Sequence, residues 1–263
     1  KNDGGIKFIG KDGVFTPEDK SDPYSDNKWD GNTYTNNSTI FGKATESSST
    51  GYGLKLSGNL GQMKFINNGL ISGEGTSKGY GIWNAGGIIG SIENIGSIFS
   101  SNIGSENFSQ NSGTSSIVGI ENIGNIGSMV GSFGIYNYSS NSNSSIEIIK
   151  NTGIISGTGT GSGFGIYNRS ENSGTSTINS LINSGVIYGS INAVKNEGGT
   201  INNAYNYGVL VTDGTSVVEN VSSGAVNSIE KYGLAFRFIL SSDIFSSVYF
   251  RPYLIRRIWK SIY

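Results

Sequence analysis

A five-residue phrase recurs twelve times between Phe65 and Ser222, and it constrains the fold of this 263-residue chain more than any other feature. Each copy reads apolar residue, any residue, Asn, any residue, then Gly or Ser; only Ser105 breaks the apolar rule at the first position. Repetition of this kind is the signature of a solenoid, in which each repeat packs mainly on its neighbours. The asparagines of the phrase are Asn67, Asn84, Asn94, Asn107, Asn122, Asn137, Asn151, Asn168, Asn183, Asn196, Asn206 and Asn220.

The copies alternate between two classes, so the structural unit is a pair of phrases. Every first-class copy ends in Gly, whereas four of the six second-class copies end in Ser. First-class asparagines follow one another at 27, 28, 29, 32 and 23 residues. This spacing predicts an all-β protein, a parallel β-solenoid (β-helix) of about six coils with roughly 28 residues per coil.

Alternation of side chains along a strand assigns the faces of each coil. The apolar residue and the Asn share the inner face, and the middle residue points outward; Glu93, Glu106, Glu121 and Glu219 are outward on this basis. The same alternation predicts that the aromatic residue two places before the Ile in three second-class copies lies in the core. These residues are Tyr80, Phe133 and Phe164.

The inward asparagines need partners, because a buried unpaired amide costs roughly 1–3 kcal/mol. Asparagines stacked about 4.8 Å apart on successive coils can bond to one another. The Gly two residues later fits a corner that needs positive φ or a close backbone approach. The alternative interpretation is that Asn-x-Gly marks only a surface turn. We predict a structural ladder through Asn67, Asn94, Asn122, Asn151, Asn183 and Asn206.

Composition divides the chain into three parts. Residues 1–47 form an N-terminal lead-in or cap, residues 48–230 the β-solenoid, and residues 231–263 a basic, aromatic tail that is either a cap or an unrelated extension. Stretches rich in Ser, Asn and Gly follow second-class copies, and we expect them to project as loops from one side of the solenoid. They span residues 109–116, 139–145 and 170–177.

The residue types exclude several kinds of chemistry. The chain holds no His and no Cys, which excludes Ser-His-Asp and Cys-His nucleophile systems and His-metal sites. The Gly-rich stretch at 157–163 lacks the Lys-Ser/Thr of a phosphate loop. A net charge of −1 gives no reason to expect a nucleic-acid partner. We therefore predict no catalytic residue, no metal site and no cofactor, in a protein that is not an enzyme.

Runs such as KNTGIISGTGTGSGFGIYN (150–168) and GIYNRSENSGTSTINSLINSGVIYG (165–189) resemble the passenger domains of bacterial autotransporters, the surface-displayed parts of proteins exported by type V secretion. The resemblance covers about residues 50–225. It implies a parallel β-helix outside the outer membrane that serves adhesion, aggregation, biofilm formation and virulence, and it transfers no catalytic residues. The parent protein would be anchored by an outer-membrane barrel that this chain lacks, so we expect a fragment or a truncated gene product.

The expected function is that of an adhesin or display stalk at the cell surface, or in secreted form. Its partner would be a glycan or protein on a host-cell or bacterial surface. The candidate binding patch is the outward pair Tyr136 and Tyr167, expected to be exposed on neighbouring coils; alternatively the two rings only stack on each other. There are two other candidate functions. A polysaccharide-degrading β-helix enzyme is the main alternative, and it would need acids that converge in a groove across several coils. An ice-binding solenoid would need a flat, regular Thr or Ser/Gly face, and the mixture of Glu, Lys, Tyr and Trp in the outward column argues against it.

Overall fold

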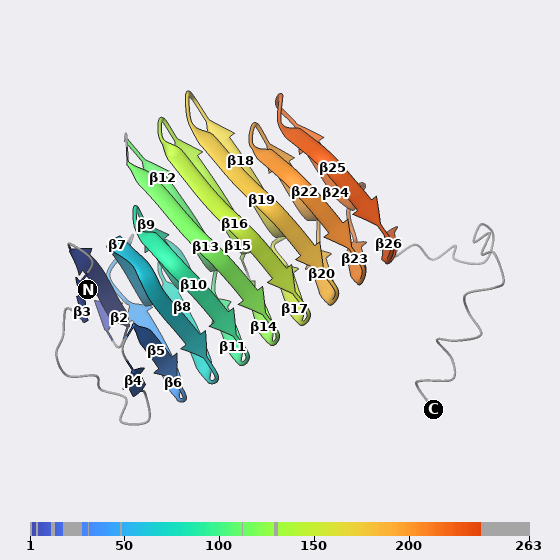
Figure 1. Ribbon diagram of the computed structural model, residues 1–263. Coiled ribbons are helices and arrows are strands. Elements are labelled where there is room, and N and C mark those ends of the chain that lie inside the picture. Colours follow the sequence, from blue (N-terminus) through green and yellow to red (C-terminus); the bar gives the residue numbers. More distant parts are fainter. Residues whose placement is uncertain are drawn as a thin grey trace, which may run out of the picture.

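The chain folds into a parallel β-solenoid of about seven coils, about 28 residues apart, which confirms the predicted fold class and adds a coil (Figure 1). The computed structural model describes residues 2–3, 5–11, 14–17, 28–30, 32–47, 49–111, 113–128 and 131–237. Most of the predicted basic tail, residues 238–263, lies outside the described residues. All regular structure in the described part of the chain is β-strand.

Successive coils place strands in three sheets, which we call A, B and C. Sheet A contains β1 (Asn2–Asp3), β6 (Thr39–Ala44), β8 (Leu70–Gly75), β11 (Ser97–Ser100), β14 (Asn125–Ser128), β17 (Ile154–Gly157), β20 (Val186–Gly189), β23 (Val209–Thr212) and β26 (Leu234–Arg237). Its strands pair in parallel, apart from the antiparallel pair of β1 with β6. Sheet A follows the first-class phrase in each coil.

Sheets B and C carry the second-class and first-class phrases respectively, and β7 (Thr50–Asn67) runs through both. Sheet B contains β2 (Ile6–Lys11), β3 (Val14–Pro17), β9 (Lys78–Ala85), β12 (Ile103–Gln110), β15 (Phe133–Ser140), β18 (Phe164–Glu171), β21 (Asn192–Glu197) and β24 (Val218–Val221). Sheet C contains β4 (Lys28–Asp30), β5 (Thr33–Asn36), β10 (Ile88–Asn94), β13 (Thr114–Asn122), β16 (Asn143–Asn151), β19 (Thr175–Asn183), β22 (Thr200–Asn206) and β25 (Ala225–Lys231).

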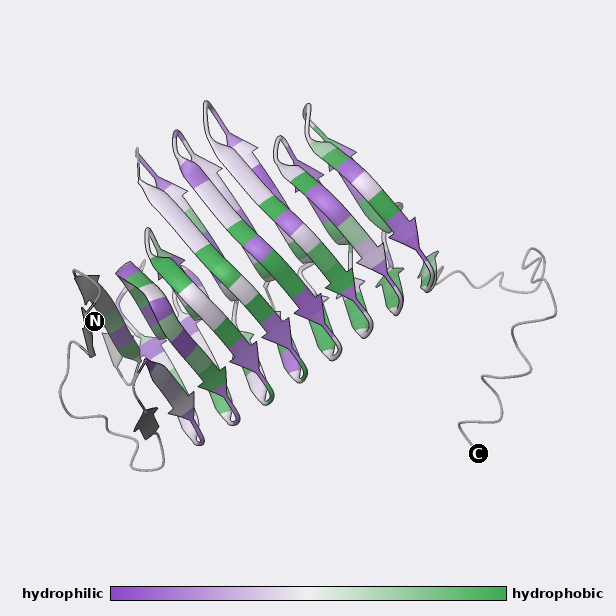
Figure 2. Cartoon of the chain, in the orientation of Figure 1, coloured by the Kyte–Doolittle hydropathy of each residue, from purple (hydrophilic) through white to green (hydrophobic). Residues whose placement is uncertain are grey.

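One continuous core runs through the coils, because apolar residues at equivalent positions of successive coils stack on one another, both in the phrases and in the strands of sheet A that follow them. Figure 2 shows these apolar positions as hydrophobic bands that cross successive strands. Burying each aliphatic side chain contributes roughly 1.5–3 kcal/mol. Typical members, all buried, are Ile92, Ile120 and Ile149 of sheet C, Ile98, Ile126 and Ile155 of sheet A, and Ile82, Ile135 and Ile166 of sheet B.

The stacking extends beyond the predicted solenoid boundaries of 48 and 230. At the N-terminal end β5 pairs in parallel with β7, with Asn36 opposite Asn67, and β6 pairs with β8. At the other end β26 continues sheet A beside β23. Residues 33–44 and 234–237 are therefore part of the solenoid.

The Ser/Asn/Gly stretches differ from the loops that we expected. They do extend from one side of the solenoid (Figure 1), but largely as continuations of β12 to β19. Asn111, Asn141 and Asn172 adopt positive φ, near 55°, where the chain reverses from sheet B to sheet C. Asn is one of the few non-Gly residues that tolerate this conformation. Buried serines keep the extension ordered, since the Ser176 hydroxyl lies 2.9 Å from those of Ser139 and Ser144.

Candidate functional site

The predicted Asn ladder is present and forms one of two amide columns inside the solenoid. In the first, the Nδ2 of each Asn donates to the Oδ1 of the next at 2.7–2.8 Å. Its members are Asn36, Asn67, Asn94, Asn122, Asn151, Asn183 and Asn206, all buried. The second, with distances of 2.7–2.8 Å, joins Asn84, Asn107, Asn137, Asn168, Asn196 and Asn220, and all of these except the exposed Asn220 are buried. These side chains are structural, and their burial rules out the surface-turn interpretation for the first column.

The Gly that follows each first-class Asn is required by close packing of the backbone. A Cβ atom added to Gly124, Gly153 or Gly185 would lie 1.9–2.1 Å from the carbonyl oxygen of the equivalent Gly in the preceding coil. No positive φ occurs at these three glycines. The corner therefore accepts no side chain.

The prediction that Tyr80, Phe133 and Phe164 lie in the solenoid core is wrong. They belong to a second cluster on the outer face of sheet B, separate from the core, and Phe133 is only half-buried. A Cβ added to Gly134, which follows Phe133, would meet Ile155 Cγ2 at 2.7 Å. The glycine thus points inward and the aromatic residue outward. Ala193 occupies the equivalent position in a later coil, where its methyl group is fully buried in the core.

The expected exposure of Tyr136 and Tyr167 is also wrong. Both point outward, yet only 7% and 5% of their surfaces are exposed. Their rings stack 5.0 Å apart, and Phe133 packs against both, at 4.6 Å from Tyr136 and 5.2 Å from Tyr167. The alternative interpretation, in which the two rings stack on each other, describes what the structure contains. We call this outward layer on sheet B the aromatic face; it comprises Tyr80, Trp83, Phe108, Phe133, Tyr136, Tyr138, Phe164 and Tyr167.

Glu106 interrupts the aromatic face. In the register of sheet B it lies between Trp83 of β9 and Tyr136 of β15, at a position where an aromatic ring would continue the column. Only 3% of its surface is exposed. It lines a groove of about 420 Å³, together with Lys78, Tyr80, Phe108, Tyr138 and Arg169. Volumes of about 300–1,000 Å³ are typical of ligand sites.

Burial raises the pKa of the Glu106 carboxyl to about 7, although the charge of Lys78 and a hydrogen bond with Tyr80 lower it in part. Burial also raises the pKa values of Tyr80 and Tyr136. The indole nitrogen of Trp83 is buried without a hydrogen-bond acceptor among the described residues. The groove thus combines apolar ring surfaces with a carboxyl group that can be neutral or charged near pH 7.

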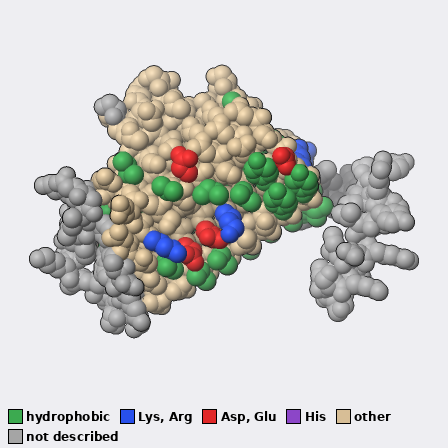
Figure 3. Space-filling model, viewed as in Figure 1, with side chains coloured by type: hydrophobic (Ala, Val, Ile, Leu, Met, Phe, Trp, Pro, Cys, Tyr) green, Lys and Arg blue, Asp and Glu red, His purple; other side chains and the backbone are tan. Residues whose placement is uncertain are grey.

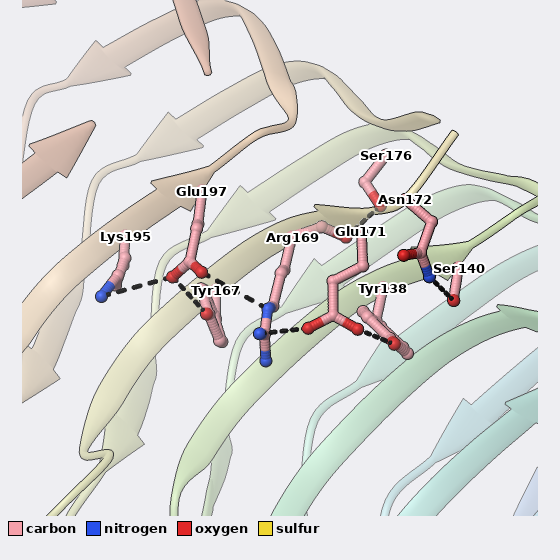
Figure 4. A network of polar contacts seen from close by, with 9 residues as sticks. All are labelled: Tyr138, Ser140, Tyr167, Arg169, Glu171, Asn172, Ser176, Lys195 and Glu197. Carbon is pink, nitrogen blue, oxygen red and sulfur yellow. Dashed lines mark hydrogen bonds and ion pairs between the residues drawn. The ribbon is translucent and has the colours of Figure 1, made fainter. Parts of the chain in front are cut away.

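A network of ion pairs closes the C-terminal side of the groove (Figure 4). Arg169 pairs with Glu171 and, at 3.6 Å, with Glu197. The Tyr138 hydroxyl donates to Glu171 at 2.5 Å and the Tyr167 hydroxyl to Glu197 at 2.7 Å. Burial alone would raise the pKa of Glu197, but the hydrogen bond from Tyr167 and the charges of Arg169 and Lys195 lower it overall. Glu197 is therefore held as a paired carboxylate.

The outer face of sheet C is different in character. Lys64 pairs with Glu93 and Lys150 with Glu121, both at 2.6 Å. Figure 3 shows basic and acidic side chains next to one another on the face in view. The side chains of the second pair are nearly half exposed, so the pair contributes at most about 1 kcal/mol. Glu93 and Glu121 are adjacent in register, as expected for outward middle positions. This face is a solvated surface.

Sequence reasoning missed Glu106 as a special acid. Alternation along the strand predicts only that Glu106 is an outward carboxylate, but aligning the second-class copies puts SENFS between IWNAG and IYNYS. That alignment contains the signal, since it sets one acid between two aromatic residues in the same column.

Within the described ranges, no group of three His, Cys, Asp or Glu residues could hold a metal ion. The same residues contain no helix long and apolar enough to cross a membrane. Comparisons with protein-family models, with curated proteins and with solved structures find no match to this chain.

Proposed function

We propose that this chain is an autotransporter-like passenger fragment that acts as an adhesin or display stalk at the outer surface of a cell, or after secretion. The observation that carries the proposal is the groove on the aromatic face, which offers ring surfaces and a buried carboxyl on the side of a solenoid. Aromatic side chains give large contact area at low entropic cost. The partner is a glycan or protein on a host-cell or bacterial surface.

The rigidity of the solenoid supports a display role. Two buried amide columns and a continuous apolar core hold successive coils in fixed register. Such a column would hold the groove in a fixed orientation relative to the point where the column is anchored. Anchoring by an outer-membrane barrel in a parent protein belongs to this proposal.

One observation favours the alternative, a polysaccharide-degrading enzyme: a carboxyl whose pKa is raised to about 7 is suited to act as a general acid. Glycoside hydrolysis generally uses two carboxyl groups on either side of the scissile bond. Glu106 is the one acid among the described residues that line the groove. Glu171 and Glu197 lie beside it, but both are paired with Arg169. Adhesion therefore remains the better-supported proposal.

The proposal can be tested by displaying the chain on bacterial cells through a fused outer-membrane barrel. Adhesion to cultured cells and autoaggregation would be measured for the parent, for Trp83→Ala in the groove, and for the control Lys150→Ala on sheet C. Circular dichroism and the thermal midpoint of each purified protein verify folding. We expect the parent to adhere above the empty carrier and the Trp83 variant to lose most of that adhesion. Adhesion no greater than that of the carrier alone would refute the adhesive role.

A further inference from the structure

We propose that the groove around Glu106 binds a single neutral pyranose unit of a glycan, which packs in the groove against Trp83, Glu106 and Tyr136. The inference rests on the adhesive function proposed above, because it assigns a ligand class to the same face. It concerns binding alone, with no bond broken or formed.

The spacing of the coils sets the distance between the two aromatic residues that flank Glu106. Trp83, Glu106 and Tyr136 occupy equivalent positions on β9, β12 and β15, so Trp83 and Tyr136 are two strands apart. Neighbouring strands lie about 4.8 Å apart, so the two positions are about 9.6 Å apart. The Glu106 side chain fills the position between them, because only 3% of its surface is exposed. A pyranose ring therefore lies in the groove of about 420 Å³ that all three residues line, and not within the column.

The charges around the groove select a neutral ligand. Glu106 is a buried acceptor on one side, whereas Lys78 and Arg169 also line the groove. A cation would meet both basic residues, and above about pH 7 an anion would meet the ionised carboxylate of Glu106. A neutral polyol carries hydroxyl groups that both donate and accept, so it can donate to Glu106 and accept from Lys78. A pyranose also has an apolar C–H face that packs on aromatic rings, which a simple polyol lacks.

The aromatic side chains can accommodate the ligand without losing hydrogen bonds. Trp83 is held by ring contacts: it stacks on Tyr80 at 5.1 Å and lies beneath the Lys55 ammonium at 4.2 Å. Its indole nitrogen has no acceptor among the described residues. A small rotation of this ring on binding therefore breaks no hydrogen bond of the indole nitrogen.

The test uses the purified full chain and defined disaccharides. Titration calorimetry would measure binding of the neutral probes lactose, cellobiose and N,N′-diacetylchitobiose, of the anionic probe digalacturonate, and of the cationic probe choline. We expect saturable binding of at least one neutral probe and none of the charged ones. Trp83→Ala should weaken that binding at least tenfold, whereas Lys150→Ala on sheet C should change it less than twofold.

A second readout keeps the test valid if a variant folds poorly. The chain has three tryptophans, and among the described residues Trp83 is the one that lines the groove, so a neutral probe should change its fluorescence. The conservative variant Trp83→Phe should abolish the change while keeping measurable binding. Preferred binding of choline or digalacturonate, no binding of any probe, or a signal unaffected by Trp83→Phe would overturn the inference.

The two proposals fail in distinguishable ways. If the purified chain binds a neutral disaccharide through Trp83 but displayed cells do not adhere, the pyranose site stands and the adhesive function fails. If displayed cells adhere above the empty carrier equally with and without Trp83→Ala and no disaccharide binds, the adhesive function stands and the pyranose site fails.

Discussion

Replacing Glu106 by Gln should abolish one specific dependence of stability on pH. Burial raises the pKa of this carboxyl from the ordinary value of 4.5 to about 7 in the folded chain. Between those two pH values the folded state holds a proton that the unfolded state has released. Stability must then fall as pH rises through this window. The contribution is fully present below about pH 4.5 and is lost above about pH 7.

The size of the effect follows from the two pKa values. One pH unit corresponds to 1.36 kcal/mol, so the total loss is about 3 kcal/mol. The tyrosines that face Glu106, Tyr80 and Tyr136, have pKa values raised by burial, so their hydroxyls stay protonated between pH 5 and pH 8.5. Lys78 is the cation whose charge most favours the ionised carboxylate. The dependence therefore belongs to Glu106.

Urea unfolding at pH 5 and pH 8.5 measures this effect as a double difference. The free energy of unfolding of the parent, relative to the Gln variant, should fall by about 3 kcal/mol between the two pH values. Any constant cost of the buried amide cancels in this comparison. Glu74→Gln is the matched control, because Glu74 lies outside the groove with its side chain 49% exposed and paired to Lys43. A parent and a Glu106 variant with parallel pH profiles would refute the assignment of a protonated, buried carboxyl.

Two further predictions concern the corner between sheets C and A. Asn151→Leu leaves the buried Oδ1 of Asn183 without its donor, so it should lower the free energy of unfolding by about 1–3 kcal/mol. Asn68→Leu, at an exposed position, is the control and should change the free energy of unfolding little. Equal urea midpoints of the two variants would contradict the stabilising role of the ladder. Gly153→Ala places a Cβ 2.0 Å from the Gly124 carbonyl oxygen and should cost about 3 kcal/mol or more. Gly161→Ala meets no atom within 4 Å, and a thermal midpoint that falls equally in both variants would show that packing is not the cause.

The columns of identical residues could be predicted from the sequence because a solenoid stacks equivalent positions. An Asn behind an apolar residue at a spacing of one coil has one consistent place, on the inner face. The same rule finds a copy that we overlooked. Tyr34-Thr35-Asn36-Asn37-Ser38 fits the phrase, and the structure places Asn36 at the head of the first ladder, with Tyr34 stacked on Phe65.

The facing of the aromatic residues could not be obtained from alternation alone. Strict alternation fails at a bend, and the bend at Gly134 turns two successive positions inward, because Ile135 is also a core residue. A clue was available, since this position holds Gly in five coils, from Gly53 to Gly165, and Ala193 in the next. A column limited to the smallest residues indicates an inward position without space. Burial of Glu106 depends on contacts between neighbouring columns, which a repeat pattern does not specify.

The amide columns impose a counting rule on changes in the length of this chain. Every inner Asn donates in the same direction, toward the C-terminal end, and carbonyl oxygens beside Nδ2, such as that of Gly124 next to Asn122, fix this orientation. Removing or duplicating one whole coil rejoins donor to acceptor in both columns. Removing part of a coil that contains one Asn leaves a buried amide unmatched in one of them. Insertions and deletions in this region should therefore be tolerated when they add or remove a whole coil. Smaller differences in length should be tolerated at the turns where the chain reverses from sheet B to sheet C.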